Sequence, residues 1–306
     1  MAVYRGSTIK LLGIAETVPG TTPTIPAMKE LPLVSFTPRQ SKNVIRSNAI
    51  RSHPFVDKIL NGSNLWEIGV NWELGRDHDL LIETFLGAAF ASDAAKFSDV
   101  LKTLSLEKQQ GGGSSLYDHY LGFFLTSLSI SVSGSDTAPV AMSASGRAFS
   151  GSWDDAATIA GSTVAASSND PFTFIGATVE FDDVATKVVS ATINLERAVD
   201  PLMELGDDDP SEFVPGLCTA TGTTTIAYRN GDQSARIENF ANVKQEYIFG
   251  SADGVYNRAF VFPETKFVGF GRSTEDRGVT LQEINWEAQY KVADGTVMTV
   301  TRDETP

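Results

Sequence analysis

Apolar and polar residues alternate strictly along residues 66–74, and this stretch is the clearest structural signal in the chain. Five apolar side chains recur at every second position, with Glu, Gly or Asn between them. This period of two predicts a β-strand with one buried face and one polar face. The apolar positions are Trp66, Ile68, Val70, Trp72 and Leu74.

Shorter alternating runs predict that most of the remaining chain is also β structure. In the last run, the apolar phase changes between Leu281 and Ile284, which predicts a β-bulge near Glu283. The further strands are expected at residues 33–51, 100–108, 124–133, 142–149, 188–195, 223–228, 259–262, 267–270 and 279–290.

Two segments follow a helical period instead. Asp77 is expected to cap a short helix that ends near Ser92. Residues 234–245 predict a second helix, with apolar side chains on one side. Long loops are expected at residues 53–64, which contain Pro and Asn-Gly breakers, and at the acidic residues 200–215.

Residues 150–170 are small and polar and contain few large apolar side chains. We interpret this stretch as a boundary, because each half has the same order of a long strand, a long loop, a second strand and a short helix. The order of elements matches, whereas residue identities do not. The sequence thus predicts a first module at residues 1–160, which includes an N-terminal arm, and a second module at residues 161–306.

The 306 residues carry a net charge of −14, which narrows the range of functions. A protein that grips DNA needs a basic face, and this chain has no basic block. The single cysteine, Cys218, cannot form an intrachain disulfide. The apolar patch at residues 9–15 is too short to span a membrane and lacks the layout of a signal peptide. We expect a protein made and used in the cytoplasm, or in particles assembled there, without membrane contact.

Several segments, taken in order, resemble the phage tail tube protein family. The resemblance covers most of the chain and implies a mainly β fold. It further implies two tandem β-sandwich or half-barrel modules, each with a short flanking α-helix. The segments that carry it are residues 41–51, the strand 66–74, the acidic start of a helix at 79–87, the strand 120–131, and the C-terminal strands 256–263 and 283–290.

The resemblance implies a structural virion protein of a long-tailed, siphovirus-type bacteriophage, with a flexible non-contractile tail. Its copies would close into rings with a β-barrel as inner wall, and the two-module version would form trimers that imitate hexamers. Stacked rings would form the tube for genome ejection, and acidic residues in its lumen would let DNA pass without specific binding. Other implied partners are the tape-measure protein, the tail terminator and the tail-tip proteins. The protein would reside in the virion tail after assembly in the host cytoplasm.

Charged residues in the first long strand and in the two loops, together with Phe55, are candidates for contacts between subunits or rings. The arginines could pair with acids of a neighbouring subunit, and a solvated strand face is an equal alternative. Three adjacent aspartates favour a solvated loop or an inter-ring contact over a calcium site, because alternating oxygen ligands are missing. The candidates are Arg39, Arg46, Arg51, Phe55, Asp57, Lys58, Asp207, Asp208 and Asp209.

No catalytic, metal-binding or cofactor-binding residue is predicted, and an enzyme is not expected. His53, His78 and His119 lack the spacing of metal ligands and are expected in loops or at helix ends. Cys218 has no nearby histidine and is expected to be a small buried residue. Two alternatives stay open from the sequence: another virion component, such as a capsid decoration protein, and a soluble β-sandwich enzyme or binding protein.

Overall fold

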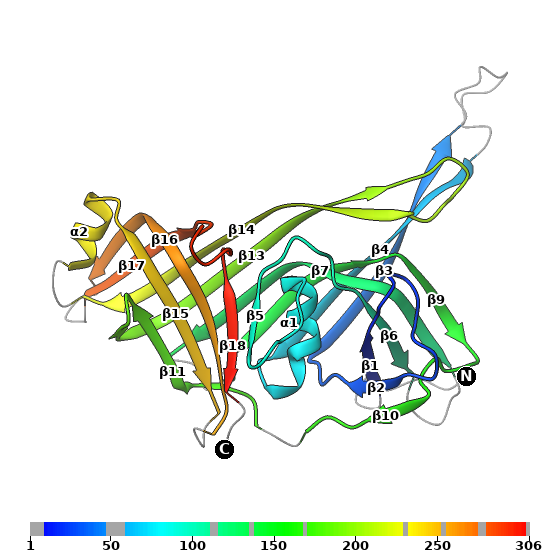
Figure 1. The fold of residues 1–306 in the computed structure, drawn as a ribbon, viewed down its shortest axis with the longest axis horizontal. Helices are drawn as coiled ribbons and strands as arrows, with labels where there is room; N and C mark the ends of the chain where they lie inside the picture. The colour runs from blue at the N-terminus through cyan, green and yellow to red at the C-terminus, as the bar shows by residue number, and fades with distance from the viewer. Residues whose placement is uncertain are drawn as a thin grey trace.

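The computed structural model describes residues 9–46, 59–110, 116–134, 138–167, 170–228, 232–251, 255–274 and 280–303. The chain is mainly β, as predicted, and its strands form one open sheet. Helix α1 (Asp79–Leu86) lies against the middle of the molecule, and helix α2 (Asp232–Glu238) lies at one end (Figure 1).

The strands fall into two consecutive sets. The first set is β1 (Lys10–Ala15), β2 (Ala27–Glu30), β3 (Ser35–Arg46), β4 (Ile59–Glu73), β5 (Ala94–Lys96), β6 (Leu104–Gln109), β7 (Tyr117–Ser133), β8 (Ala141–Ala148) and β9 (Ser150–Asp155). The second set is β10 (Ser162–Val164), β11 (Thr173–Phe181), β12 (Val184–Thr186), β13 (Val188–Leu202), β14 (Glu212–Ala227), β15 (Asn242–Gly250), β16 (Asn257–Thr274), β17 (Thr280–Ala288) and β18 (Thr299–Asp303).

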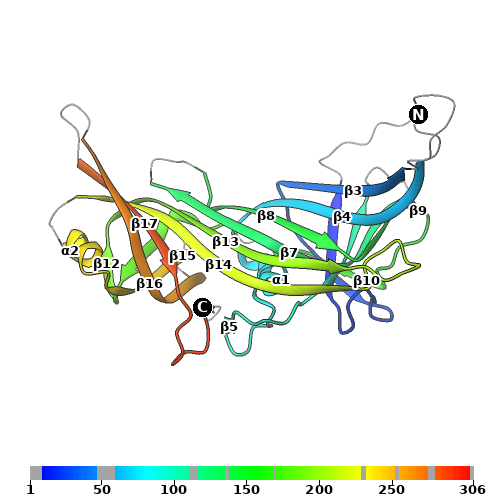
Figure 2. The same cartoon turned by 90° about the horizontal axis from the view of Figure 1, so that it is seen from above.

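One antiparallel row of strands runs through the length of the molecule, in the order β3, β4, β8, β7, β13, β14, β17 and β16. The pairing of β7 with β13 lies in the middle of this row and joins the two sets of strands. Seen from above, β3 lies near one end of the molecule and β16 and β17 lie near the other (Figure 2). β3 and the second half of β16 are therefore the outer members of the row.

Among the described residues, every pairing within β1–β9 has a counterpart within β11–β18. The pairs β1–β2, β1–β6, β3–β4, β4–β8, β6–β7, β7–β8 and β7–β9 correspond to β11–β12, β11–β15, β13–β14, β14–β17, β15–β16, β16–β17 and β16–β18. Register shifts also recur, for example between Leu125 and Ser127 on β7 and between Phe267 and Gly269 on β16.

The strand predicted at residues 66–74 forms the second half of β4, which ends at Glu73, and its five apolar side chains are all buried. They belong to one apolar cluster that continues through β7, β8, β13 and β17, and α1 covers it with Leu81 and Phe85. Burial of each large side chain contributes roughly 1.5–3 kcal/mol. The alternation in the sequence therefore determines which face of the row is covered and which stays in water.

The prediction that Asp77 caps the first helix is wrong. Residues 76–78 form a 3-10 turn, and the Asp77 carboxylate accepts hydrogen bonds from the N–H and hydroxyl groups of Ser167 and pairs with Lys29. Burial alone would raise the pKa of Asp77, but these partners lower it. Asp77 therefore joins the helix start to the segment after β10 instead of capping α1.

The first helix also ends earlier than predicted, at Leu86 rather than near Ser92. Gly87 adopts φ 71°, and its N–H donates a hydrogen bond to the carbonyl of Glu83. A Cβ on Gly87 would lie 2.0 Å from the carbonyl oxygen of Val100, so only glycine fits this left-handed helix end.

Among the described residues, part of each predicted long loop is instead β-strand. Residues 59–64 belong to β4, and residues 53–58 lie outside the described part of the chain. In the acidic segment only residues 203–211 connect β13 with β14. Apolar side chains stabilise the extended ends of β13 and β14, because Val199 and Phe213 pack on Phe124 in a small separate cluster.

The second helix is shorter than predicted, because residue 242 already begins β15. Gln245 is a fully buried strand residue whose side chain donates to the hydroxyl of Thr265. The two strands predicted at 259–262 and 267–270 are one strand, β16, whose pairing with β15 shifts register between Phe262 and Thr265.

The β-bulge predicted near Glu283 is also wrong. β17 pairs with β14 in unbroken register, and the shift in its other pairing lies on β16. Gln282 is fully buried and occupies the inward position that a hydrophobic residue was expected to take. Leu281 therefore lies on the opposite face without any change of phase.

Candidate assembly surfaces

We call the pairing of residues 127–133 on β7 with residues 190–196 on β13 the seam. Its buried pairs are Leu128 with Leu195 and Ile130 with Ile193. On the opposite face, the hydroxyl of Ser129 donates a 2.8 Å hydrogen bond to Oδ1 of Asn194. The seam thus has an apolar face towards the core and a hydrogen-bonded polar face.

Arg197, on β13, anchors the seam to helix α1. Its guanidinium group donates hydrogen bonds to the carbonyls of Phe85 (3.4 Å), Ser98 (3.0 Å) and Val100 (3.2 Å), and its Cζ lies 5.1 Å from the ring centre of Phe97. Burial lowers the pKa of Arg197. The partial negative charge of carbonyls at the C-terminal end of α1 offsets part of that desolvation cost.

Both outer strands of the row have an edge along which the described residues provide no strand partner. β3 pairs only with β4. Residues 267–274 of β16 pair only with β17, whereas the first half of β16 pairs with β15 and β18. Unpaired strand edges of this length favour pairing with another chain.

The edge of β16 exposes apolar side chains. Val268 and Phe270 are 55% and 42% exposed. The Cζ atom of Arg272 lies 5.6 Å from the ring centre of Phe270 and 4.3 Å from that of Tyr228. Apolar side chains beside an open edge are typical of a surface that assembly covers.

The face of the row opposite to the core is polar and mainly acidic. Ser and Thr residues line much of it, with cross-strand hydrogen bonds such as that from Thr223 to Asn285 (2.8 Å). Arg39 and Arg147 are basic residues on this face. Its exposed carboxylates are Glu67, Glu73, Glu196, Glu283 and Glu287.

The β3–β4 and β13–β14 hairpins project from the same side of the row, and their ends lie together (Figure 1). Asn64 joins them, because its N–H donates to the carbonyl of Asp208 (2.6 Å) and its side chain donates to the Asp208 carboxylate (3.2 Å). We call these ends the paired tips. Exposed apolar side chains of the paired tips are Val44, Ile45, Leu60, Leu202, Met203 and Leu205.

A family model described as phage tail tube protein matches residues 6–288, which is nearly the whole chain. The chain belongs to the phage tail tube protein family. It is a structural component of the virion tail, which confirms the family expected from the sequence. No curated protein matches it. Among the described residues, no helix is long and apolar enough to cross a membrane.

The structure places only some of the contact residues expected for this tail tube protein. Arg39 and Arg46 are exposed on β3. Residues 207–209 lie in the turn of the β13–β14 hairpin, where Asp208 contacts Asn64 of the other hairpin. The two predicted candidate segments are thus neighbours in space. The candidates Arg51, Phe55, Asp57 and Lys58, together with His53, lie outside the described residues.

An ion-pair network that was not predicted from the sequence surrounds His119, which lies in strand β7 rather than in a loop or at a helix end. Its ring nitrogens lie 3.3 Å from Glu107 and 2.8 Å from Asp155. Burial alone would lower the pKa of His119, but Glu107 and Asp155 raise it. Burial would raise the pKa of Glu107, yet the nearby ring of His119 and hydrogen bonds from Gln109 and the N–H of Ile159 hold that pKa at about 2. No sequence signal links these distant positions.

His78 lies directly before α1, at a helix end as expected. Its Nε2 is 2.7 Å from the carbonyl oxygen of Pro32. Burial lowers the pKa of His78 to about 4, with a smaller contribution from the positive charge of Arg258. The ring is therefore neutral at physiological pH and serves as a packing and hydrogen-bonding group.

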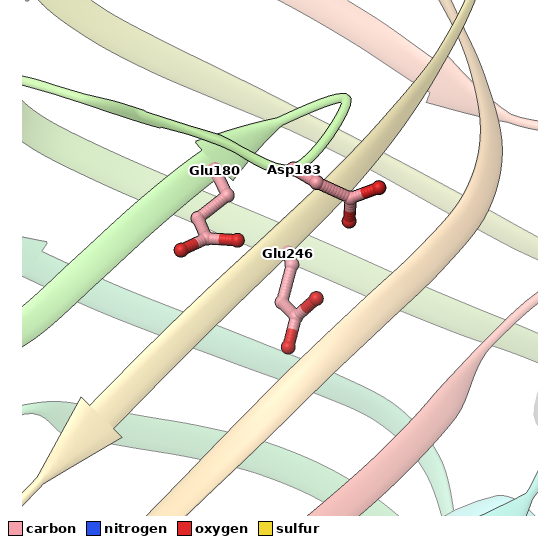
Figure 3. A group of neighbouring side chains, drawn as sticks. All are labelled: Glu180, Asp183 and Glu246. Carbon is pink, nitrogen blue, oxygen red and sulfur yellow. The ribbon is translucent and has the colours of Figure 1, made fainter.

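Three carboxylates, of Glu180, Asp183 and Glu246, have oxygens within 4.8 Å of one another (Figure 3). Lys244 lies beside them, with Nζ 2.6 Å from Asp183 and 3.2 Å from Glu246. The hydrogen bond to Asp183 raises the pKa of Lys244. A lysine ammonium group already compensates this negative charge, and we assign no ligand to the cluster.

Cys218 is half-buried on β14, more accessible than expected. Burial raises the pKa of its thiol to about 11, against the opposing effect of Arg197. The thiol is therefore protonated at neutral pH and is a poor nucleophile.

Proposed function

We propose that copies of this tail tube protein self-assemble into closed rings, and that stacked rings form the conduit through which the phage genome is ejected. The single observation that carries the proposal is that one row of strands has two open edges at opposite ends of the molecule. Each copy can pair with a neighbour at both edges, so a ring satisfies every edge and leaves no strand unpaired. Membership of the family supports this reading.

We further propose that residues 1–160 and 161–306 are two tail-tube modules, so that three chains form a ring that imitates a hexamer. The recurrence of the same strand pairings and register shifts in both sets supports duplication. A ring of three chains with eight strands each would have an inner wall of 24 strands. Closure into a barrel also requires the twist and tilt that sheets of this kind adopt.

The polar face of the row would line the lumen. Its other face is covered by the apolar cluster and α1, so only the polar face is free to meet water. The carboxylates of Glu67, Glu196 and Glu287 would repel DNA phosphates and let the genome slide without specific binding. This arrangement assigns lumen positions that the sequence alone left open.

The paired tips would contact the next ring of the stack. They carry exposed apolar side chains and the acidic turn, and they extend beyond the body of the molecule. The candidates Arg39, Arg46 and Asp207–Asp209, with Arg51, Phe55, Asp57 and Lys58, remain proposed contact residues of subunits or rings. We also propose a siphovirus-type tail assembled in the host cytoplasm, with the tape-measure, terminator and tail-tip proteins as partners.

Negative-stain electron microscopy of the purified protein over a range of concentrations tests self-assembly. We expect hollow rings and tubes, either alone or after addition of the tail-tip complex. Leu205→Asp at the paired tips should allow rings but reduce stacking, and Leu217→Asp, at an exposed site away from the tips, should behave like the wild type. Compact single particles under all conditions would contradict the proposal and favour a decoration protein or a soluble binding protein.

A further inference from the structure

We propose that the second half of β16 of one copy pairs antiparallel with β3 of the next copy in the register of the internal seam, and that Lys42 of the second copy binds the end of α2 of the first. This inference rests on the proposed ring and identifies its subunit contact residue by residue. The partner is a second copy of this chain. The template for the contact is the pairing of β7 with β13 inside one chain.

Strand β16 occupies the same place in the second set of strands as β7 does in the first. On β7, Thr126 is the extra residue at the register shift against β8, and on β16 Val268 is the extra residue at the shift against β17. Each strand has a second register shift three residues earlier. On β7 it lies at Phe123, in the pairing with β6, and on β16 it lies at Thr265, in the pairing with β15. Two matching shifts at the same spacing fix the alignment, in which Phe270 corresponds to Leu128.

Strand β3 occupies the same place in the first set of strands as β13 does in the second. Their pairings with β4 and β14 contain the same shift, after Lys42 on β3 and after Arg197 on β13. Across this shift, the paired residue on β4 changes from Asn64 to Asn61, and the paired residue on β14 changes from Cys218 to Pro215. Lys42 therefore corresponds to Arg197.

The seam register can now be transferred to the contact between copies. In this register Gly271 takes the place of Ser129, and Arg39 of the next copy takes the place of Asn194. Gly271 and Arg39 are therefore expected to pair on the polar face. The other expected pairs are Thr274 with Phe36, Ser273 with Thr37, Arg272 with Pro38, Phe270 with Gln40, and Gly269 with Ser41.

The exposure of apolar side chains on β16 is consistent with a strand of another copy pairing along its open edge. Leu128 is 1% exposed because β13 lies beside it, whereas its counterpart Phe270 is 42% exposed at the open edge. Pairing with β3 would cover Phe270. Pro38 has no N–H donor, which weakens one rung of the ladder and also discourages non-specific pairing before assembly.

Lys42 would have the same role as Arg197. Arg197 binds the carbonyl of Phe85 at the end of α1, together with the carbonyls of Ser98 and Val100, and Lys42 is exposed on β3 in the single chain. Both helices are followed by a residue with positive φ, Gly87 after α1 and Phe240 after α2. The carbonyls at the end of α2, near Glu238, would therefore meet a cation from the next copy.

Cysteine pairs test the register directly, in a Cys218→Ser background. Gly271→Cys with Arg39→Cys should form disulfides between copies in assembled tubes, giving covalent dimers and closed trimers on non-reducing gels. Ser129→Cys with Asn194→Cys is the matched control and should close within one chain. Ser273→Cys with Arg39→Cys, two residues out of register, should cross-link at least about tenfold more slowly, because diagonal Cβ atoms are too far apart.

A second measurement concerns Lys42. Lys42→Glu should raise the concentration needed for assembly about tenfold, by loss of a cation at a helix end and repulsion, whereas Lys42→Arg should assemble normally. Lys187→Glu, an exposed control outside the register, should have no effect, and thermal melting verifies that all three variants fold. Tubes without Gly271–Arg39 cross-links, faster cross-linking of the shifted pair, or unchanged assembly of Lys42→Glu would overturn the inference. Absence of tubes from the wild type would instead overturn the proposed function.

Discussion

Asn64 on β4 donates two hydrogen bonds to Asp208 in the turn of the β13–β14 hairpin, one from its backbone and one from its side chain. Asp208→Ala removes only the second bond. We expect amide hydrogen exchange at residues 203–211 to become about three- to tenfold faster, because a net hydrogen bond contributes about 1 kcal/mol. Exchange mass spectrometry measures this. Asp207→Ala is the control and should leave the turn unchanged; equal effects of both variants would show that the contact does not order the tip.

His78 should make the fold less stable in acid. Its pKa is near 6.5 in the unfolded chain and about 4 in the folded one, so between these values the unfolded state binds more protons. Stability should therefore fall as pH decreases from 6.5 to 4, by up to about 3 kcal/mol. Urea unfolding at several pH values measures the slope. His78→Gln keeps a donor for Pro32 and should flatten it; an unchanged slope would contradict the assignment.

His119 should change the pH dependence of folding stability in the opposite direction to His78, and at higher pH. Its folded pKa is raised, so its stabilising contribution is complete below about 6.5 and is lost as pH rises through the folded value. Melting temperatures between pH 6 and 9 should fall more for the wild type than for His119→Gln. Parallel curves for the two proteins would show that Glu107 and Asp155 do not hold a charged imidazole.

Asp79 should be far more sensitive to substitution than the neighbouring Asp93. Its two carboxylate oxygens bind Arg258, which is 1% exposed, and Arg302. Asp79→Asn removes the negative charge that binds the buried guanidinium group of Arg258 and should cost roughly 3–5 kcal/mol in chemical unfolding. Asp93→Asn removes only an exposed partner of Arg302 and should cost less than about 1 kcal/mol. Similar losses for both variants would contradict this ranking.

The polar face should control how DNA interacts with the tube. Replacement of Glu67, Glu196 and Glu287 by lysine should give tubes that bind DNA, with binding that weakens as salt increases. Replacement of the same residues by glutamine should not create binding, because no positive charge is added. A filter-binding titration at two salt concentrations compares them. DNA binding by wild-type tubes at moderate salt would contradict a lumen lined by these carboxylates.

The sequence predicted the buried face of the row well where large apolar residues alternate without interruption, as from Trp66 to Leu74. It failed where a polar residue occupies a core position, because Gln282 resembles a surface residue in any pattern analysis. It also failed at the hairpin ends, where Asp200 and Asp207 suggest a loop although Val199 and Phe213 extend both strands. The local pattern of apolar and polar residues does not indicate which distant strand covers a given residue.

The assembly surfaces were less accessible to sequence analysis than the fold. The expected contact residues Arg39 and Asp208 do lie on the outer strand and at the paired tips. Phe270 and Lys42 were not singled out, because their significance comes from correspondence with Leu128 and Arg197 through strand pairings. That correspondence requires the register of the sheet, and register depends on contacts between distant segments, such as the residues of β7 and β13 that pair although they lie 57 to 69 positions apart in the sequence.

The rotational symmetry of assembled tubes, determined by cryo-electron microscopy, tests the central claim most directly. We predict true threefold symmetry with sixfold pseudosymmetry, three chains in each ring, and a continuous wall to which every chain contributes eight strands. Rings of six chains, or an open helical sheet without closed rings, would contradict the account of two modules per chain.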